Sequence, residues 1–416
     1  MVDTVCVIGA AGHVGFPFSL VVADVGHKVY GIDISSAACD NLNNGIIPFI
    51  EKNADQYLEK NIKNGNLFFT PDSSKIAKSD IICIMLGTPM DAEGNPRLDY
   101  LLSFVENELL NNIKQNQIII LRSTISPGTT ELIKKIIEDK TGWIEGINFH
   151  LVFAPERVAQ GLGIEESKKF PQMIGAFTQT SYNLVSNFFE SFSDAGSEFL
   201  TPKEAEYGKL MTNMYRYVNF ALANEFYMLA ARYDVDVHKV TAAINKNYPR
   251  MNLPLPGPNV GGPCLFKDGK FLVKDIPYAD LIQNAFLINE GMPQYIMNRL
   301  KDGLPKKIAI FGMTFKAEND DIRNSLSFKL KKLCRSQGID VVCFDPYLNL
   351  LPDIDWKSID AIVIMTPHKF FIEYFENIKN SLHPNTRMVD IWKLLEYSKH
   401  SATGIYDIYI TGIIQE

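Results

Sequence analysis

The stretch VCVIGAAGHVG, residues 5–15, decides the fold of the N-terminal part of the chain. Its apolar start predicts a buried strand, and three glycines in the spacing GxxGxxG follow before a helical pattern begins. A glycine turn between a strand and a helix presents backbone N–H groups that can bind a pyrophosphate. The loop is one residue from the commoner GxGxxG and still permits the tight turn. Its predicted dinucleotide-binding residues are Gly9, Gly12, His13, Val14 and Gly15.

An acidic residue after the second apolar run, KVYGIDI from Lys28, indicates which dinucleotide binds. Asp33 lies 24 positions after Gly9, where a carboxylate can accept hydrogen bonds from both ribose hydroxyls. NAD is favoured over NADP, because the carboxylate would repel a 2′-phosphate. The alternative is that the glycine turn only closes a βα unit, and Asp33 argues against it.

Further apolar runs predict parallel sheets in both halves of the chain. DIICIMLG from Asp80, QIIILRST from Gln117 and HLVFAPE from His150 continue the first half. The second half contains KKIAIFGM from Lys306, IDVVCFDP from Ile339, DAIVIMTP from Asp360 and TRMVDIW from Thr386. Their alternation with helical patterns predicts an α/β fold with two Rossmann-like, doubly wound parallel sheets.

The middle of the chain predicts helices. From Pro202 to about Asn245 there is almost no Gly or Pro, and apolar residues recur at helical spacing, which predicts one long helix followed by shorter ones. A loop rich in Pro and Gly, PLPGPNVGGPC from Pro254, interrupts this pattern, which resumes from about Lys270 to Leu300. We predict an NAD-binding Rossmann domain at 1–198, a central all-helical domain at 199–300 and a second Rossmann-like domain at 301–416.

Composition and charge exclude several classes of protein. The chain has 416 residues, 46% of them hydrophobic, and no apolar run approaches the roughly 20 residues that span a bilayer. A start without a charged leader favours a cytoplasmic protein without a membrane partner. A net charge of -7 without basic runs argues against nucleic-acid binding. Six scattered cysteines without a CxxC pair argue against a disulfide framework or a metal site.

Cys264 differs from the other cysteines in its surroundings. It lies in NVGGPCLFKD, which we expect to be a loop in which Gly261 and Gly262 let the backbone approach a ligand. Lys267 and Asp268 bring charge near the thiol, and nearby cations increase the thiolate fraction. An average cysteine is an inert small hydrophobe. The composition of this loop favours a nucleophile instead.

Other polar residues are candidates by position alone. Thr88 and Thr124 follow two predicted strands, at the sheet edge where nicotinamide and substrate should bind, although hydroxyls are common in turns without any ligand. Lys209, Asn213 and Arg216 fall on one face of the predicted long helix. That face is either a binding stripe or, with Glu206, an exposed row of ion pairs.

Seven motifs in chain order resemble the UDP-glucose/GDP-mannose dehydrogenase family. The resemblance implies two dinucleotide-fold domains, joined by a central helical domain whose long helix forms a homodimer. It implies an NAD-dependent nucleotide-sugar 6-dehydrogenase whose C-terminal domain binds a UDP-sugar, and a four-electron oxidation with two NAD molecules per sugar. The motifs are GAAGHVGFP, LGTPMD, STISPGTT, APERVAQG, KLMTNMYRYVNFALANE, GPNVGGPCLFKD and GMTFKAENDDIRNS.

The resemblance also implies catalytic roles. Cys264 matches the nucleophile that captures the C6 aldehyde as a thiohemiacetal, which a second oxidation converts to a thioester. Lys209 and Asn213 match groups that stabilise the developing oxyanion, and Asp268 matches the carboxylate near the thiol. Thr124 and Glu156 match groups that orient or activate water. We expect Glu156 to be the base for thioester hydrolysis, with its pKa raised by partial desolvation.

Binding residues follow from the same resemblance. Phe315 and Lys316 match nucleotide-sugar contacts, and Arg323 matches an arginine that reaches toward cofactor or substrate. The alternative is that Lys316 and Arg323 pair with Asp320 and Asp321 in a surface loop. The predicted substrate-binding residues are Arg157, Val158, Lys209, Asn213, Arg216, Arg250, Gly261, Phe315 and Lys316. The predicted cofactor-binding residues outside the glycine loop are Asp33, Thr88, Thr124, Lys267 and Arg323.

The identity of the sugar stays open. Arg157, Val158 and Gln160, with Arg216 and Arg250, resemble family members that act on UDP-N-acetylmannosamine or UDP-N-acetylglucosamine for surface polysaccharide synthesis. VGGPC in place of VGGHC and the retained Lys267 depart from those members, so UDP-glucose is the alternative. A catalytically silent binding protein is a further alternative, suggested by Pro263. A two-electron hydroxyacid or malate-type dehydrogenase is another, which leaves the Cys264 loop unexplained.

Overall fold

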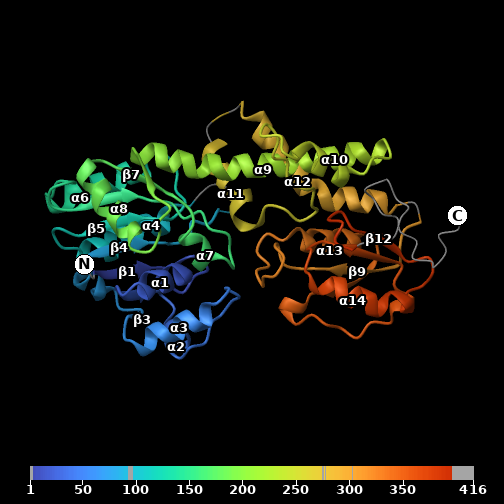
Figure 1. The fold of residues 1–416 in the computed structure, drawn as a ribbon, viewed down its shortest axis with the longest axis horizontal. Helices are drawn as coiled ribbons and strands as arrows, with labels where there is room; N and C mark the ends of the chain where they lie inside the picture. Colours follow the sequence, from blue (N-terminus) through green and yellow to red (C-terminus); the bar gives the residue numbers. More distant parts are fainter. Residues whose placement is uncertain (1–2, 92–96, 274–275, 277, 302, 396–416) are drawn as a thin grey trace. The chain divides into compact units, whose positions relative to one another are not determined.

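The computed structural model describes residues 3–91, 97–273, 276, 278–301 and 303–395. The chain forms two compact units (Figure 1), the first from residues 1–212 with 270–274 and the second from residues 213–269 with 275–416. Helix α9 (Pro202–Arg232) begins in the first unit and continues into the second. The three-domain boundaries expected from the sequence stay a prediction.

The first unit contains an eight-stranded sheet in the order β3-β2-β1-β4-β5-β6-β7-β8. Neighbouring strands are parallel except for the antiparallel pair of β6 and β7. The five apolar runs of the first half form strands as predicted, whereas β3, β7 and β8 were not predicted. The strands are β1 (Thr4–Ile8), β2 (Lys28–Ile32), β3 (Leu67–Thr70), β4 (Ile81–Ile84), β5 (Ile118–Leu121), β6 (His150–Phe153), β7 (Gln172–Ala176) and β8 (Ser197–Leu200).

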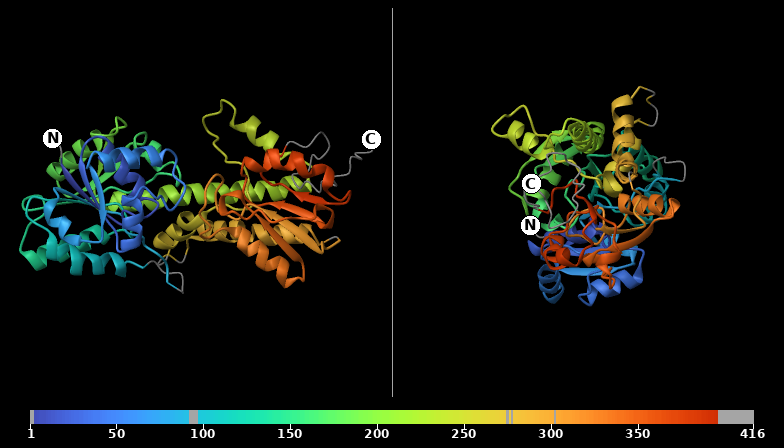
Figure 2. Two further views of the ribbon diagram at one scale, coloured as in Figure 1. Left: turned by 90° about the horizontal axis from the view of Figure 1, so that it is seen from below. Right: turned by 90° about the vertical axis from the view of Figure 1, so that its right-hand side faces the viewer.

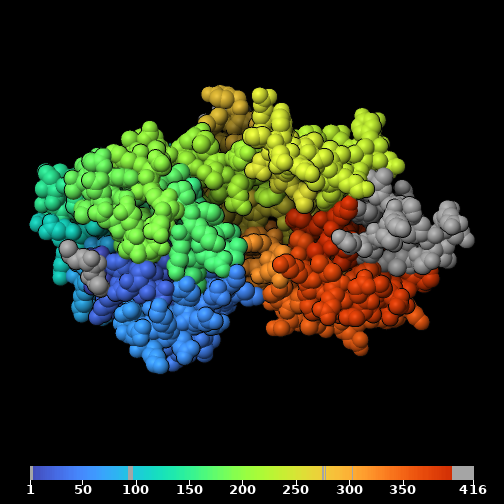
Figure 3. Space-filling model, viewed as in Figure 1, coloured from blue at the N-terminus to red at the C-terminus, as the bar shows by residue number. Residues whose placement is uncertain are grey.

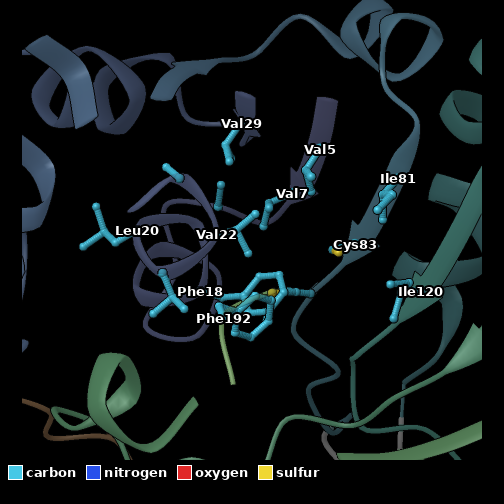
Figure 4. Close-up of a cluster of buried hydrophobic side chains, with 14 of the residues drawn as sticks. Val5, Val7, Phe18, Leu20, Val22, Val29, Ile81, Cys83, Ile120 and Phe192 are labelled. Carbon is cyan, nitrogen blue, oxygen red and sulfur yellow. The ribbon is translucent and has the colours of Figure 1, made fainter. Parts of the chain in front are cut away.

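Alternating residues of the central strands explain why this sheet is covered on both faces. Val5 and Val7 of β1 pack against helix α1 (Gly15–Asp24), in the cluster that Figure 4 shows. Cys6 and Ile8 point to the other face, where they belong to a second buried cluster. A strand buried on both faces needs a continuous apolar sequence. The other helices of this unit are α2 (Ser36–Asn43), α3 (Ala54–Lys63), η1 (Ser73–Lys78), α4 (Asp99–Phe104), η2 (Val105–Leu109), α5 (Leu110–Asn112), α6 (Thr129–Thr141), α7 (Gly163–Ser167) and α8 (Gln179–Glu190).

The second unit contains a four-stranded parallel sheet in the order β10-β9-β11-β12. Alternate strand residues pack toward α12 and α13 on one face and toward α14 on the other. Figure 2 shows the orange to red strands of this sheet with helices on both sides. With the first sheet, this confirms the predicted fold class of two Rossmann-like sheets and a helical middle segment. The elements are α12 (Asp280–Arg299), β9 (Lys307–Phe311), α13 (Leu326–Ser336), β10 (Asp340–Phe344), η3 (Pro346–Leu348), η4 (Trp356–Ser358), β11 (Ala361–Ile364), α14 (Phe370–Ile378), η5 (Lys379–Ser381) and β12 (Arg387–Val389).

The helices of the middle segment are those expected, with one correction. The predicted long helix is α9, and α10 (Val237–Asn245) follows it. The expected loop around Cys264 is wrong, because α11 begins earlier than predicted and spans Gly262–Val273. Pro263 is its second residue, where a missing N–H leaves no hydrogen bond unmade. Cys264 therefore lies in the first turn of a helix.

Among the described residues, none of the helices is both long enough and apolar enough to cross a membrane. The six cysteines are all free thiols. In the same part of the chain, no group of three or more His, Cys, Asp or Glu side chains is placed to hold a metal ion.

Candidate active site

The glycine loop of the first unit is built for close backbone approach. Gly9 has φ +80°, and a Cβ there would lie 2.8 Å from the Met85 carbonyl oxygen. A Cβ on Gly15 would lie 2.3 Å from the carbonyl oxygen of Gly9. The start of α1 can therefore lie against the end of β1 only because Gly15 lacks a side chain, and Gly9 lies against the segment after β4 for the same reason. The first turn of α1 has no acidic residue, which suits an anion at this helix N-terminus.

Asp33 lies against the same loop. Its carboxylate accepts a hydrogen bond of 3.1 Å from the Ala11 amide and one of 3.2 Å from the Ser35 amide. These bonds fix the carboxylate beside the glycine turn, where a ribose would follow the pyrophosphate. The side-chain-free cradle and the adjacent carboxylate together fit NAD.

The segment after β6 also contacts this loop, which the sequence did not indicate. The Gln160 side-chain amide lies 2.7 Å from Nδ1 of His13, and the His13 ring packs on Phe49 with 4.1 Å between centroids. The Lys52 amide donates to the Gly161 carbonyl at 3.2 Å. The segment that contains Arg157 and Val158, two predicted substrate-binding residues, is thus linked to the predicted cofactor loop through Gln160.

The two predicted strand-end hydroxyls are adjacent. The Thr88 hydroxyl donates to the Thr124 carbonyl at 2.7 Å, and Thr88 is buried. This bond joins the segments that follow β4 and β5. Thr124 itself is half-buried, so its side chain keeps some access to solvent.

Glu156 lies in a different electrostatic setting from the one expected. Burial acts to raise the pKa of this carboxyl, but the Arg122 guanidinium at 2.5 Å, the Arg157 amide and the charge of Lys209 outweigh it and lower the pKa. The expected raised pKa is therefore wrong. The sequence reasoning missed Arg122, whose only local signal is a charged residue at the end of an apolar run.

The polar residues of α9 do not form one solvated face. Glu206 is buried and caps α6, accepting from the Gly128 amide at 2.5 Å and the Thr130 amide at 2.7 Å. The alternative in which Glu206 belongs to an exposed row of ion pairs is therefore wrong. Lys209 is buried, whereas Arg216 is exposed.

In the second unit, a buried polar network lies one helical turn beyond Cys264. Cys264 is the third residue of α11 and is exposed. Asp268, on the same helix face, is fully buried. Its carboxylate accepts a hydrogen bond of 2.5 Å from the Asn213 side-chain amide, and Lys267 Nζ lies 3.0 Å from its other oxygen. The structure thus brings together four of the predicted site residues.

The turn before α11 is tightly enclosed. Gly261 and Gly262 have φ +119° and +53°, and a Cβ on them would lie 2.9 Å from the Tyr217 ring and 2.4 Å from the Phe315 ring, respectively. Phe315, a predicted substrate contact, therefore packs directly on the start of the helix that carries Cys264.

Arg323 also belongs to this region. Its guanidinium binds both oxygens of Asp321 at 2.6 to 3.0 Å, which is the pairing that the surface-loop alternative anticipated for this residue. The hydrogen bond to Asp321 raises the pKa of Arg323 most, and the charge of Cys264 adds to it. Arg323 thus lies within electrostatic range of the thiol. Lys316 is half-buried and Arg250 is exposed.

Comparison with known proteins places these features in one family. Residues 3–193 match the NAD binding domain of the UDP-glucose/GDP-mannose dehydrogenase family, residues 203–290 its central domain and residues 309–397 its UDP binding domain. The chain belongs to this family. It is therefore an NAD-dependent nucleotide-sugar dehydrogenase, and its UDP binding domain indicates a UDP-sugar substrate.

Individual relatives are similar to this dehydrogenase over most of its length. A UDP-N-acetyl-D-mannosamine dehydrogenase of Pyrococcus horikoshii is 34% identical over 86% of this chain and 88% of its own. One from Methanocaldococcus jannaschii is 32% identical over 98% of this chain and 96% of its own. A solved structure of the Pyrococcus horikoshii UDP-D-ManNAc dehydrogenase has a TM-score of 0.88 and 31% identity, covering 95% of this chain and 96% of that one.

The two units of the dehydrogenase contain different candidate site residues. The first contains the glycine loop, Asp33, the strand-end threonines and Glu156 with Lys209. The second contains the thiol of Cys264 with Asn213, Lys267 and Asp268, and the residues around Phe315 and Arg323. Helix α9 contributes Lys209 to the first group and Asn213 to the second.

Proposed function

We propose that this dehydrogenase oxidises the C6 alcohol of UDP-N-acetyl-D-mannosamine to the uronate, with Cys264 as the covalent nucleophile. The observation that carries the proposal is the exposed thiol in the first turn of α11. The unpaired N–H groups of a helix N-terminus favour a thiolate, as does a nearby cation such as Arg323. Simple alcohol oxidation would not need such a nucleophile.

The residues around the thiol suit a covalent oxidation in two stages. NAD, when bound, supplies the hydride acceptor for both oxidations. The first oxidation removes a hydride and the hydroxyl proton from the C6 alcohol and leaves the aldehyde. The sulfur of Cys264 then adds to the aldehyde carbon, and the oxygen of the resulting thiohemiacetal gains the thiol proton. Loss of a hydride and that proton leaves a thioester, which water cleaves to the uronate and the free thiol. Lys209 and Asn213 are proposed to stabilise the oxyanion that forms at both additions.

Asp268 and Thr124 have supporting roles in this proposal. Because the buried Asp268 carboxylate binds both Asn213 and Lys267, it holds an amide and an ammonium group one turn from the thiol. Thr124 is proposed to orient the water that cleaves the thioester. The cofactor residues are proposed to be those of the glycine loop with Asp33, Thr88, Thr124, Lys267 and Arg323.

We propose the identity of the sugar from the names of the relatives and from the residues of the segment that follows β6. The relatives described above are named for UDP-N-acetyl-D-mannosamine, and Arg157 and Val158 lie in the segment joined to the cofactor loop through Gln160. UDP-glucose is the second candidate, because Lys267 is retained and pairs with Asp268. A panel of UDP-sugars with NAD, followed at the NADH absorbance, tests the choice. Greatest kcat/KM with UDP-glucose or UDP-N-acetylglucosamine would refute it.

A homodimer through α9 is also proposed. Large apolar or aromatic side chains at helical spacing remain exposed on this helix. The light green segment that contains α9 lies at the surface in Figure 3. An apolar stripe of this kind on a long helix is typical of helix–helix association. The exposed residues of the stripe are Tyr207, Met211, Tyr215, Leu222, Phe226 and Leu229.

We further propose a cytoplasmic location and a role in surface polysaccharide synthesis.

A further inference from the structure

One buried amide side chain fastens the segment before α11 to the second sheet. Asn259 lies five residues before Cys264 and is 4% exposed. Its Oδ1 accepts a hydrogen bond of 2.8 Å from the amide of Leu326, the first residue of α13. Its Nδ2 lies 2.9 Å from the Thr314 carbonyl oxygen and 3.1 Å from the Thr366 hydroxyl. Asn259 thus joins three segments that lie far from it in the chain.

The hydroxyl groups around Asn259 are oriented to accept hydrogen bonds from it. The Thr366 hydroxyl donates to the Thr314 carbonyl at 2.5 Å, and the Ser327 hydroxyl donates to the Gly312 carbonyl at 2.7 Å. Because each hydroxyl has only one proton, both present lone pairs to Nδ2, at 3.1 and 3.3 Å. This site therefore requires a group that donates on one side and accepts on the other, as a carboxamide does.

Asn259 occupies the point at which an open α/β sheet ordinarily binds its ligand. Such ligands bind at the carboxyl ends of the strands, where the strand order reverses. In the order β10-β9-β11-β12 this reversal lies between β9 and β11, and Thr314 and Thr366 follow those two strands. Leu326 begins the helix that follows β9. The segment 254–261 therefore fills this point with its own side chain, and the sheet anchors the segment that leads to the thiol.

The same contacts connect the thiol segment to the predicted nucleotide-sugar contacts. Phe315 and Lys316 come directly after Thr314, whose carbonyl binds Asn259. The Phe315 ring also packs on Gly262, the first residue of α11, where a Cβ would lie only 2.4 Å away. The residues expected to bind the nucleotide and the helix that carries the thiol are thus fixed to one another.

We propose that Asn259 is a positioning residue that places the Cys264 thiol relative to the bound UDP-sugar, so that the thiol captures the C6 aldehyde. The inference rests on the proposed function. In the capture, sulfur bonds to C6 and the thiol proton passes to the aldehyde oxygen. The preceding oxidation of the alcohol does not need the thiol. Loss of the anchor therefore impairs capture more than the first oxidation, because a displacement of about 1 Å can cost about 100-fold in rate.

The share of substrate that leaves as aldehyde measures this effect. The enzyme is incubated with NAD, the UDP-sugar and methoxyamine, which converts free aldehyde to an oxime, and oxime and uronate are quantified by mass spectrometry. In Asn259→Ala we expect the ratio of oxime to uronate to rise about tenfold or more, and the NADH formed per sugar to fall from two toward one. Thr366→Val removes one acceptor of the Asn259 amide at similar volume, and should raise the same ratio by a smaller factor.

Asn43→Ala is a matched control in the first unit. The Asn43 side chain donates to the Phe69 carbonyl at 2.8 Å and accepts from the Phe69 amide at 2.9 Å, which fastens α2 to β3. The control should lower the free energy of unfolding in urea and leave the ratio of oxime to uronate unchanged. A merely structural role of Asn259 would give the same pattern in Asn259→Ala.

A wild-type ratio of oxime to uronate in Asn259→Ala would overturn the proposal. If that variant does not fold, a wild-type ratio in Thr366→Val overturns it instead. Failure of the proposed function gives a different result, which is normal uronate formation by Cys264→Ser or no NADH from the wild type with any UDP-sugar. Positioning is then tested by alkylation of Cys264 with iodoacetamide. UDP should change the alkylation rate of the wild type and not that of the Asn259 or Thr366 variant, and equal effects would overturn the inference.

Discussion

A single methyl group at Gly15 tests whether the loop after β1 binds NAD through its backbone. An ideal Cβ at this position would lie 2.3 Å from the Gly9 carbonyl oxygen, 2.9 Å from the Gly9 carbonyl carbon and 3.0 Å from the Ala10 Cα. Close carbon–oxygen contacts in proteins are about 3.3–3.6 Å. Because all three neighbours are backbone atoms, no side chain can rotate away. The loop or α1 must therefore move by about 1 Å in Gly15→Ala.

A shift of this size separates the loop amides from a bound pyrophosphate, since N–H···O bonds require about 2.7–3.2 Å. Loss of one charge-assisted hydrogen bond costs about 1.5–3 kcal/mol, so the Kd for NAD should rise about 10- to 150-fold. Overpacking should also lower the free energy of unfolding by about 1–3 kcal/mol. Calorimetric titration with NAD and urea unfolding measure the two effects.

Gly291→Ala is the matched control for Gly15→Ala. Gly291 lies in α12 and has no atom within 4 Å of an ideal Cβ, so we expect NAD affinity to stay unchanged and the helix to gain stability. If Gly15→Ala also binds NAD with wild-type Kd and unfolds at the wild-type urea concentration, the backbone-cradle argument is wrong.

Three further variants test separate features. Cys264→Ser should abolish uronate formation while NAD and the UDP-sugar still bind, and wild-type uronate yield by mass spectrometry would remove the thiol from the reaction. Burial raises the pKa of Asp390 to about 6, above its value of about 3.9 in an unfolded chain. The folded state therefore holds this proton more tightly, and wild type should lose stability relative to Asp390→Asn as pH rises from about 4 to about 6. Urea midpoints that differ equally at both ends of this range would contradict that. Phe226→Lys on α9 should yield monomers in sedimentation, unlike Phe328→Lys on α13, where the side chain is 40% exposed compared with 41% for Phe226. A dimeric Phe226→Lys would argue against an interface on α9.

Most of the strands predicted from the sequence in the first unit are buried on both faces. β1, β4, β5 and β6 have almost wholly buried residues, so their apolar runs are continuous. β3 and β8 lie at the two edges of the sheet and expose residues such as Phe68 and Phe199. β7 contains Gly175, whose Cβ would meet the backbone of Pro202 at the start of α9. Exposed residues at the sheet edges, and a glycine where a helix packs closely, interrupt the continuous apolar run by which a buried strand is recognised.

Some residues of the candidate site were likewise predictable from the sequence, and others were not. Gly9, Gly15 and Asp33 were predictable because adjacent elements determine their roles. Arg122 was not, since its partners Phe18, Phe189 and Glu156 come from three distant elements that only the folded sheet brings together. The position of Cys264 in a helix rather than a loop was also missed. Its Gly-Gly-Pro sequence is equally compatible with a loop and with the first turn of a helix.

The number of NADH molecules formed per UDP-N-acetyl-D-mannosamine consumed tests the central claim most directly. The purified enzyme is incubated with excess NAD and a limiting amount of the sugar, and NADH absorbance is compared with the product identified by mass spectrometry. A thiol-dependent four-electron oxidation predicts two NADH for each uronate. One NADH per sugar with an aldehyde product, or none at all, would contradict it.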